Sequence, residues 1–193
     1  MEPLGREDLL PLERYAEERA AFRARVMAHK RNREVALGAN ARLVFEDRLT
    51  IQYQVQEMLR VERIFEPAGI LEELAAYNPL IPDGDNWKAT FLLEYEDVEE
   101  RRAALARLRG IAETVWMQVG TQARVLAIAD EDMGRENGDK TSSVHFLRFD
   151  LTPESVNAAK GGAAIRCGID HPAYRVETVL NESVRAALVA DLA

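Results

Sequence analysis

Residues 45–65 read FEDRLTIQYQVQEMLRVERIF, and the architecture of the N-terminal part depends on the structure of this stretch. Ile51, Tyr53 and Val55 alternate with glutamines, which is the pattern of a half-buried strand. The stretch is nevertheless long for a strand, contains no turn residue, and has a helical composition in its second half. We therefore favour a helix, which ends before Pro67 because the residue preceding a proline is pushed out of helical geometry.

One side of this expected helix carries polar side chains at steps of three or four residues. They are two carboxylates, a hydroxyl, a phenol and a guanidinium, contributed by Glu46, Thr50, Tyr53, Glu57 and Arg60. Gln52 and Gln56 flank this row. Carboxylates serve as general acids or bases, and an arginine binds anions, so we interpret the row as the lining of a polar site. The alternative is the solvated face of an amphipathic helix.

The rest of the chain alternates between helical and extended patterns. A first helix opens at Asp8 or Pro11 and finishes in a basic run, and a hairpin follows around Gly38-Ala-Asn40. Further helices are expected at residues 68–77, 97–110, from 152 onward and 182–192, and strands at residues 87–95, 114–119, 123–128, 143–151 and 163–169, with a turn at 170–174. The sum predicts one α+β domain with a largely antiparallel sheet and packed helices, helix-rich over residues 1–80 and strand-rich over residues 81–193.

Composition excludes several classes of protein. The chain has 193 residues, 47% of them hydrophobic, which is enough for a packed core, and a net charge of −8, which opposes binding to nucleic acid or an anionic membrane. No apolar run approaches the roughly 20 residues of a membrane helix, and the N-terminus lacks the pattern of a signal peptide. Cys167 is the only cysteine, so no internal disulfide forms, and we expect a cytoplasmic protein.

Two further groups of residues are candidates for a site. Asn86, Trp87 and His145 are expected to join the polar row, with the loop at residues 130–140 as a lid. A basic cluster of His29, Lys30, Arg31 and Arg33 is a candidate anion site, or else the solvated end of a helix. The three histidines show no ligand spacing among themselves, and no phosphate loop or dinucleotide motif is present, so we expect neither a metal nor a cofactor.

Several segments together resemble a known family. They are AFRARVMAHKRNREVALG, LVFEDRLTIQYQVQEMLRVERIF, AYNPLIPDGDNWKATFLLEY, SSVHFLRFDLTPE and IDHPAY. These segments resemble a bacterial domain-of-unknown-function family, number 3501, over nearly the whole chain. The resemblance implies a single domain, and it implies genes encoding a rubrerythrin-like protein and an iron–sulfur oxidoreductase as neighbours. Either protein is therefore a candidate partner in redox or peroxide defence.

Two hypotheses of function follow. The first is a non-catalytic accessory protein that docks a partner, or a small anionic ligand, through the polar row and the basic cluster. The alternative is a cofactor-independent or weakly metal-dependent enzyme with a polar pocket around Glu57, Arg60 and His145, which requires a carboxylate with a raised pKa. The edges of the expected sheet also favour a homodimer, since an isologous pair is the commonest way of covering them.

Overall fold

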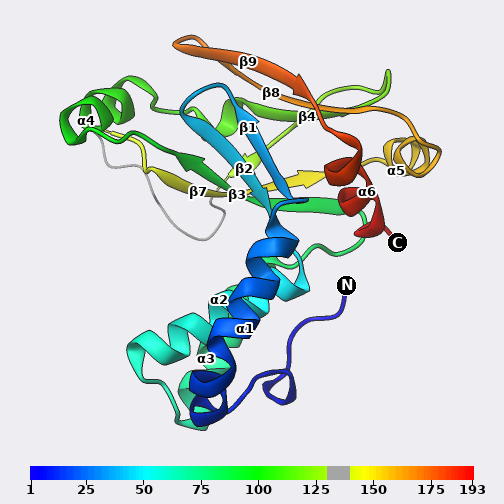
Figure 1. Cartoon of the computed structure of the whole chain (residues 1–193). Coiled ribbons are helices and arrows are strands. Elements are labelled where there is room, and N and C mark those ends of the chain that lie inside the picture. Colours follow the sequence, from blue (N-terminus) through cyan, green and yellow to red (C-terminus); the bar gives the residue numbers. More distant parts are fainter. Residues whose placement is uncertain (130–139) are drawn as a thin grey trace.

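A computed structural model describes residues 1–129 and 140–193 and shows a helical arm attached to a larger body (Figure 1). The arm consists of α1 (Leu12–Lys30), α2 (Arg48–Glu62) and α3 (Pro67–Tyr77), with the short 3-10 helices η1 (Arg6–Asp8) and η2 (Asn78–Leu80). The body contains α4 (Val98–Arg107), η3 (Ala112–Thr114), α5 (Pro153–Lys160) and α6 (Glu182–Ala190) around two antiparallel sheets. The α+β prediction is confirmed, although the strands form two sheets.

The first sheet has the strand order β1-β2-β3-β7-β6, and the second has the order β5-β4-β8-β9. The first comprises β1 (Glu34–Leu37), β2 (Ala41–Phe45), β3 (Asn86–Leu93), β7 (Val144–Asp150) and β6 (Ile128–Ala129). The second comprises β5 (Val125–Leu126), β4 (Val115–Val119), β8 (Ile165–His171) and β9 (Tyr174–Val179). Every described pairing is antiparallel. The chain crosses between arm and body three times, from α1 to β1, from β2 to α2 and from η2 to β3.

The two sheets enclose the core of the body. At one side the chain passes from β5 to β6 through Ala127, whose amide donates a hydrogen bond to the carbonyl of Val115. At the other side the Tyr174 hydroxyl on β9 donates to the carbonyl of Leu37 on β1. Its oxygen also accepts a hydrogen bond from the Asn40 amide. The sheets are therefore joined along both edges.

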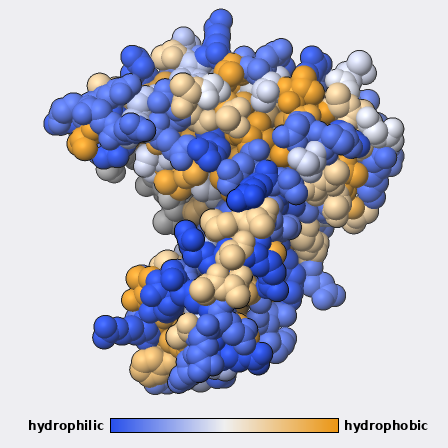
Figure 2. Space-filling model, viewed as in Figure 1, coloured by the Kyte–Doolittle hydropathy of each residue, from blue (hydrophilic) through white to orange (hydrophobic). Residues whose placement is uncertain are grey.

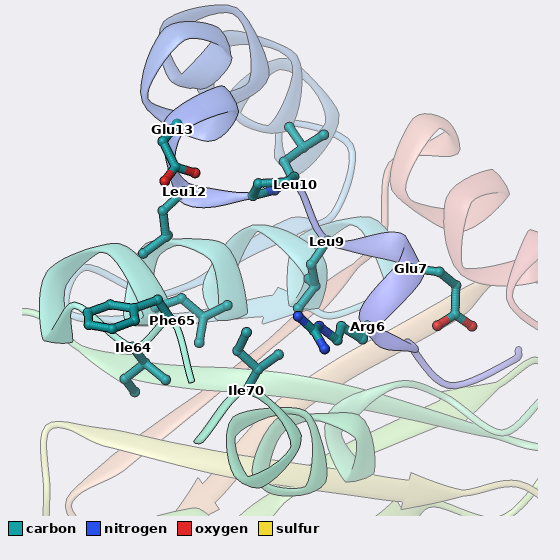
Figure 3. A pocket seen from close by; sticks show the side chains of 11 residues that line it. Arg6, Glu7, Leu9, Leu10, Leu12, Glu13, Ile64, Phe65 and Ile70 are labelled. Carbon is teal, nitrogen blue, oxygen red and sulfur yellow. The ribbon is translucent and has the colours of Figure 1, made fainter. Parts of the chain in front are cut away.

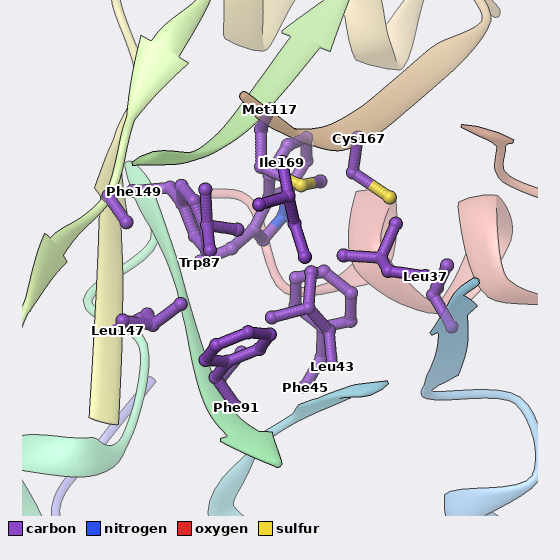
Figure 4. Packing of buried hydrophobic residues seen from close by; sticks show 14 of the residues in the cluster. Leu37, Leu43, Phe45, Trp87, Phe91, Met117, Leu147, Phe149, Cys167 and Ile169 are labelled. Carbon is purple, nitrogen blue, oxygen red and sulfur yellow. The ribbon is translucent and has the colours of Figure 1, made fainter. Parts of the chain in front are cut away.

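Alternation along the strands fills this enclosed space with large apolar side chains (Figure 4). On β3, Trp87 and Phe91 are fully buried, and Phe45 and Phe149 on neighbouring strands meet them in the same cluster. Burying one such side chain stabilises the fold by about 1.5–3 kcal/mol. Cys167 on β8 belongs to this core, where burial raises the pKa of its thiol to about 12.

A second, smaller core lies inside the arm. Its α2 contribution is Ile51, Val55 and Leu59, which lie on one face of the helix at steps of four residues. Leu74 of α3 is the matching buried residue of the neighbouring helix. The helix predicted for the segment at residues 45–65 is therefore confirmed.

Two sequence predictions about strands were wrong. Residues 123–128 were expected to form one strand, but they divide between β5 and β6, which belong to different sheets. β9 was not predicted. Its residues alternate between more and less buried positions directly after the turn expected at residues 170–174. The lid expected at residues 130–140 falls on residues 130–139, outside the described part of the chain, except for Lys140. Within that part, no helix combines the length and apolar composition needed to cross a membrane.

Candidate functional site

The start of α2 differs from the expected arrangement. Asp47 is the N-cap, and its carboxylate accepts a hydrogen bond from the Thr50 amide at 2.9 Å, so Glu46 precedes the helix rather than belonging to the polar row. Glu46 is buried, with 2% of its surface exposed, and its carboxylate accepts hydrogen bonds from the hydroxyls of Thr50 and Thr90. These contacts join the base of the arm to β3.

The two glutamines of the row hold the N-terminal segment against α2. The Gln56 side chain accepts a hydrogen bond from the Leu10 amide at 2.6 Å and donates one to the Leu10 carbonyl at 3.3 Å. Gln52 donates to the carbonyl of Asp8 at 2.6 Å. The two side-chain amides therefore satisfy backbone groups of the N-terminal segment that no strand pairing satisfies.

Glu57 is the centre of the contacts between α1 and α2. It accepts two hydrogen bonds from Arg19, both at 2.8 Å, and one from the Tyr15 hydroxyl at 2.6 Å. Arg60 adds a longer contact at 3.3 Å. The hydrogen bonds from Arg19 are the largest cause that lowers the pKa of Glu57 to about 2, against the opposing effect of partial burial. Glu57 is thus an ionised structural carboxylate, and the raised pKa that the enzyme hypothesis requires is absent from it.

Tyr53 completes the packing of the row, since its ring stacks on Phe22 of α1 with centroids 6.1 Å apart. The row therefore lies between helices, and most of its members hold α1, α2 and the N-terminal segment together.

The other predicted site residues lie in the body. Trp87 donates its indole N–H to the Leu188 carbonyl inside the main core. Asn86 exchanges hydrogen bonds with Asp83 in the loop before β3. His145 is buried on β7, where its Nε2 lies 2.9 Å from the Thr141 hydroxyl. The structure does not bring these three residues together with Glu57 and Arg60.

The four residues of the predicted basic cluster do not act together: His29 and Arg33 form ion pairs, whereas Lys30 and Arg31 do not with any described residue. Arg33 is 2% exposed, donates to the carbonyls of Phe45 and Glu46, and pairs with the carboxylate of Asp191 at the end of α6. His29 lies 2.5 Å from Asp47, which also lies 3.4 Å from Arg33. We call these four residues, His29, Arg33, Asp47 and Asp191, the neck network. Lys30 and Arg31 face solvent, at least in part, and make no ion pair with a described residue.

Opposing effects act on the two carboxylates of the neck network. Burial works against ionisation of Asp47, but the charge of Arg33 and the hydrogen bonds from Thr50 and His29 outweigh it and lower the pKa. Burial dominates at Asp191 and raises its pKa, although Arg33 opposes that effect. Neither aspartate was predicted from the sequence as a site residue. Asp47 carried a signal, an aspartate three residues before a threonine at a helix start, whereas Asp191 carried none.

A hollow with a largely apolar lining, which we call the arm-tip pocket, lies near the free end of the arm (Figure 3). Its volume is about 680 Å³, and it is formed by the N-terminal segment, the end of α2 and the start of α3. Its lining residues are Arg6, Glu7, Leu9, Leu10, Pro11, Leu12, Glu13, Leu59, Ile64, Phe65 and Ile70. A larger hollow of about 850 Å³ beside α4 has a more polar lining, which includes Arg42 and Glu94, already paired with each other at 3.0 Å.

Large apolar side chains are exposed at this end of the arm. Phe65 lines the pocket and is 67% exposed, because Arg63 adopts a left-handed conformation and turns the chain out of the helix. Val61 is 62% exposed, and Leu71 on α3 is 58% exposed. Figure 2 shows hydrophobic residues at this end of the arm. An exposed apolar group beside a hollow is typical of an interaction site.

Among the described residues, no three His, Cys, Asp or Glu side chains lie close enough together to hold a metal ion. The arm tip offers apolar side chains and charged groups for contact with another molecule.

Comparison with known proteins places this geometry in a family. A search of curated proteins finds no match. A crystal structure of a novel protein of unknown function from Burkholderia pseudomallei K96243 is similar over 100% of both chains, with 49% sequence identity and a TM-score of 0.95. A family model described as "protein of unknown function (DUF3501)" matches residues 3–192. The resemblance of the sequence segments is thereby confirmed, and the chain belongs to the DUF3501 family.

Proposed function

We propose that this chain is a non-catalytic accessory protein of the cytoplasm, and that it docks a protein partner through the tip of its arm. The observation that carries the proposal is the exposed Phe65 side chain in the lining of the pocket, at an end of the arm where Val61 and Leu71 are also exposed. The contacts behind the pocket support it, because Gln52, Gln56 and Glu57 hold the surrounding segments in one arrangement before a partner arrives.

The charge of the tip indicates the chemistry of the partner. Residues 1–21 and 57–77, which form the tip and parts of the arm nearer the body, contain eleven Asp or Glu and five Arg, a net charge of −6 within a chain of −8. Glu7 and Glu13 line the pocket itself, together with one cation, Arg6. A complementary partner presents a bulky apolar side chain surrounded by Lys and Arg. Such a partner inserts the apolar group into the pocket, while its cations meet the acidic rim.

The family resemblance indicates which partners to test first. They are the iron–sulfur oxidoreductase and the rubrerythrin-like protein whose genes the resemblance implies as neighbours. Of these two proteins, we expect the partner to be the one whose surface carries an exposed apolar side chain surrounded by Lys and Arg. A redox accessory role for this chain follows only if one of them binds.

The proposal is tested by measuring binding of each purified candidate to immobilised full-length chain. Phe65→Asp should weaken the interaction by at least tenfold, since exposed aromatic anchors are typical hot spots. Val179→Asp is the matched control, because Val179 is 59% exposed on β9, in the body, and it should bind like the wild type. Raised salt should also weaken binding. Equal binding by the wild type and Phe65→Asp, or no binding of either candidate, would count against the proposal.

A further inference from the structure

The outer face of α1 is exposed and has no neighbour in the arm. Tyr15 and Val26 face inward and are fully buried, whereas the opposite side of the helix faces solvent. The exposed residues on that side are Glu13, Glu17, Ala20, Ala24, Ala28 and Arg31. Figure 2 shows weakly hydrophobic residues running down the front of the arm, where α1 lies in Figure 1, with hydrophilic residues on both sides.

This face has opposite charges at its two ends. Glu13 and Glu17 lie toward the arm tip, Arg31 lies toward the body, and none of the three makes an ion pair with a described residue. Residues 23–33 contain five Lys or Arg and no Asp or Glu. The helix dipole favours this order of charges only within the first and last turns, so it does not account for Glu17 or Arg23 inside the helix. A partner with the reverse order of charge would be complementary to this face along its whole length.

We propose that the partner of this face is a second copy of the chain, bound through α1 in antiparallel orientation around a twofold axis at Ala24. Positions 17 and 31, and positions 20 and 28, lie at equal distances on either side of position 24. In this register Glu17 faces Arg31 of the other copy, Ala20 faces Ala28, and Ala24 faces itself. One surface thus supplies both halves of its complement, as an isologous interface requires.

Side-chain size and direction allow the two helices to approach. Alanine at positions 20, 24 and 28 permits an interaxial distance near the lower end of the usual range of about 8–10 Å. Arg25 lies close to the proposed axis, where two like charges would meet. Its guanidinium instead turns back over the Phe22 ring of its own helix, 4.7 Å from the ring centroid. A parallel pair would place Glu17 against Glu17 and Arg31 against Arg31, so charge selects the antiparallel arrangement.

A disulfide tests the axis directly in the full-length protein. Cys167 is fully buried, and the raised pKa of its thiol keeps it unreactive, so a new surface cysteine is the only accessible one. Ala24→Cys should form a disulfide-linked dimer on mild oxidation. Ala173→Cys in the exposed turn between β8 and β9 is the matched control and should form no disulfide-linked dimer under the same conditions. Failure of Ala24→Cys to cross-link, or equal cross-linking of both variants, would overturn the proposal.

A charge exchange tests the register by analytical ultracentrifugation. Glu17→Arg and Arg31→Glu each convert two attractive contacts of the symmetric interface into two repulsive ones, so each should weaken the dimer about tenfold or more. The double variant restores opposite charges and should return to within about threefold of the wild type. Phe65→Asp at the arm tip should leave self-association unchanged, which separates this proposal from the docking function. A wild-type chain that remains monomeric at high micromolar concentration, or a double variant as weak as the single ones, would refute it.

Discussion

Glu57 illustrates how one side chain determines the geometry of the arm. Its two oxygens accept hydrogen bonds from Tyr15 and Arg19 of α1, while the carboxylate belongs to α2. The side chain remains 20% exposed, so the pair is partly screened by solvent. A bidentate arginine contact in this environment is stronger than an ordinary surface ion pair, because geometry and partial burial both favour it.

We expect Glu57→Gln to lower the free energy of unfolding by about 2 kcal/mol near neutral pH, because Arg19 loses its charged acceptor. The pKa of Glu57 falls from 4.5 to about 2 on folding, so its ionised form stabilises the arm above the unfolded value. That contribution disappears as the pH falls from 4.5 through the folded value near 2. Urea denaturation of both proteins at several pH values should therefore show a difference that shrinks in acid.

The control is Glu18→Gln, which removes an exposed ion pair between Glu18 and Arg14, both on α1. Its effect should stay within about 0.5 kcal/mol. A difference between wild type and Glu57→Gln that does not change with pH would show that the carboxylate charge contributes nothing.

At the scale of elements, the neck network connects the helices α1, α2 and α6 with the strands β1 and β2. Arg33 lies between α1 and β1, its backbone acceptors lie at the end of β2, Asp47 caps α2, and Asp191 ends α6. The arm meets the body here, so these charges determine how the arm is attached. Buried ion pairs rarely add much net stability, but removing one partner leaves the other charge buried and uncompensated.

Arg33→Met should therefore lower the free energy of unfolding by about 3–5 kcal/mol. Asp191→Asn alone should also destabilise the protein, since it leaves Arg33 without its partner at the end of α6. The double variant should lose less than the sum of the two single losses, because each single change creates a penalty that the other removes. Denaturant unfolding of the four proteins measures this coupling, and strictly additive losses would contradict it.

The elements were predictable where a local pattern decides them. α2 followed from the length of its stretch and the lack of turn residues, and Asp47 had the chemistry of an N-cap. β9 alternates clearly and was missed only because Pro172 and the turn around it ended the prediction too early. The candidate site was less predictable, because alternation tells which side chains are buried but not which of two cores receives them. His145 and Glu57 were predicted to share one pocket, but His145 lies on β7 in the body and Glu57 on α2 in the arm.

The neck network could be predicted from local sequence patterns even less than the candidate site. Arg33 and Asp191 are separated by 158 positions, and no periodicity in either segment connects them. Contacts of this kind depend on the docking of α6 against the body. They become visible only when the tertiary arrangement is known.

The residues that the structure describes form two hydrophobic cores with no member in common. The body core is centred on residues such as Trp87 and Phe91, and the arm core contains Ile51, Val55 and Leu59. The chain passes three times between them, through a neck where the buried polar contacts of the neck network lie. Such an arrangement favours local unfolding in separate units, because loss of one core does not remove the contacts of the other.

Leu59→Ala and Phe91→Ala test this separation. Each removes a nearly or fully buried side chain and should destabilise its own core by about 2–5 kcal/mol. In hydrogen exchange under native conditions, Leu59→Ala should speed the exchange of α1, α2 and α3 while β3 and β7 keep their protection. Phe91→Ala should expose the strands of the body, and the arm should follow only as far as the neck network transmits the change. If both variants accelerate exchange equally in arm and body, the two cores unfold as one cooperative unit, and the arm is no independent docking element.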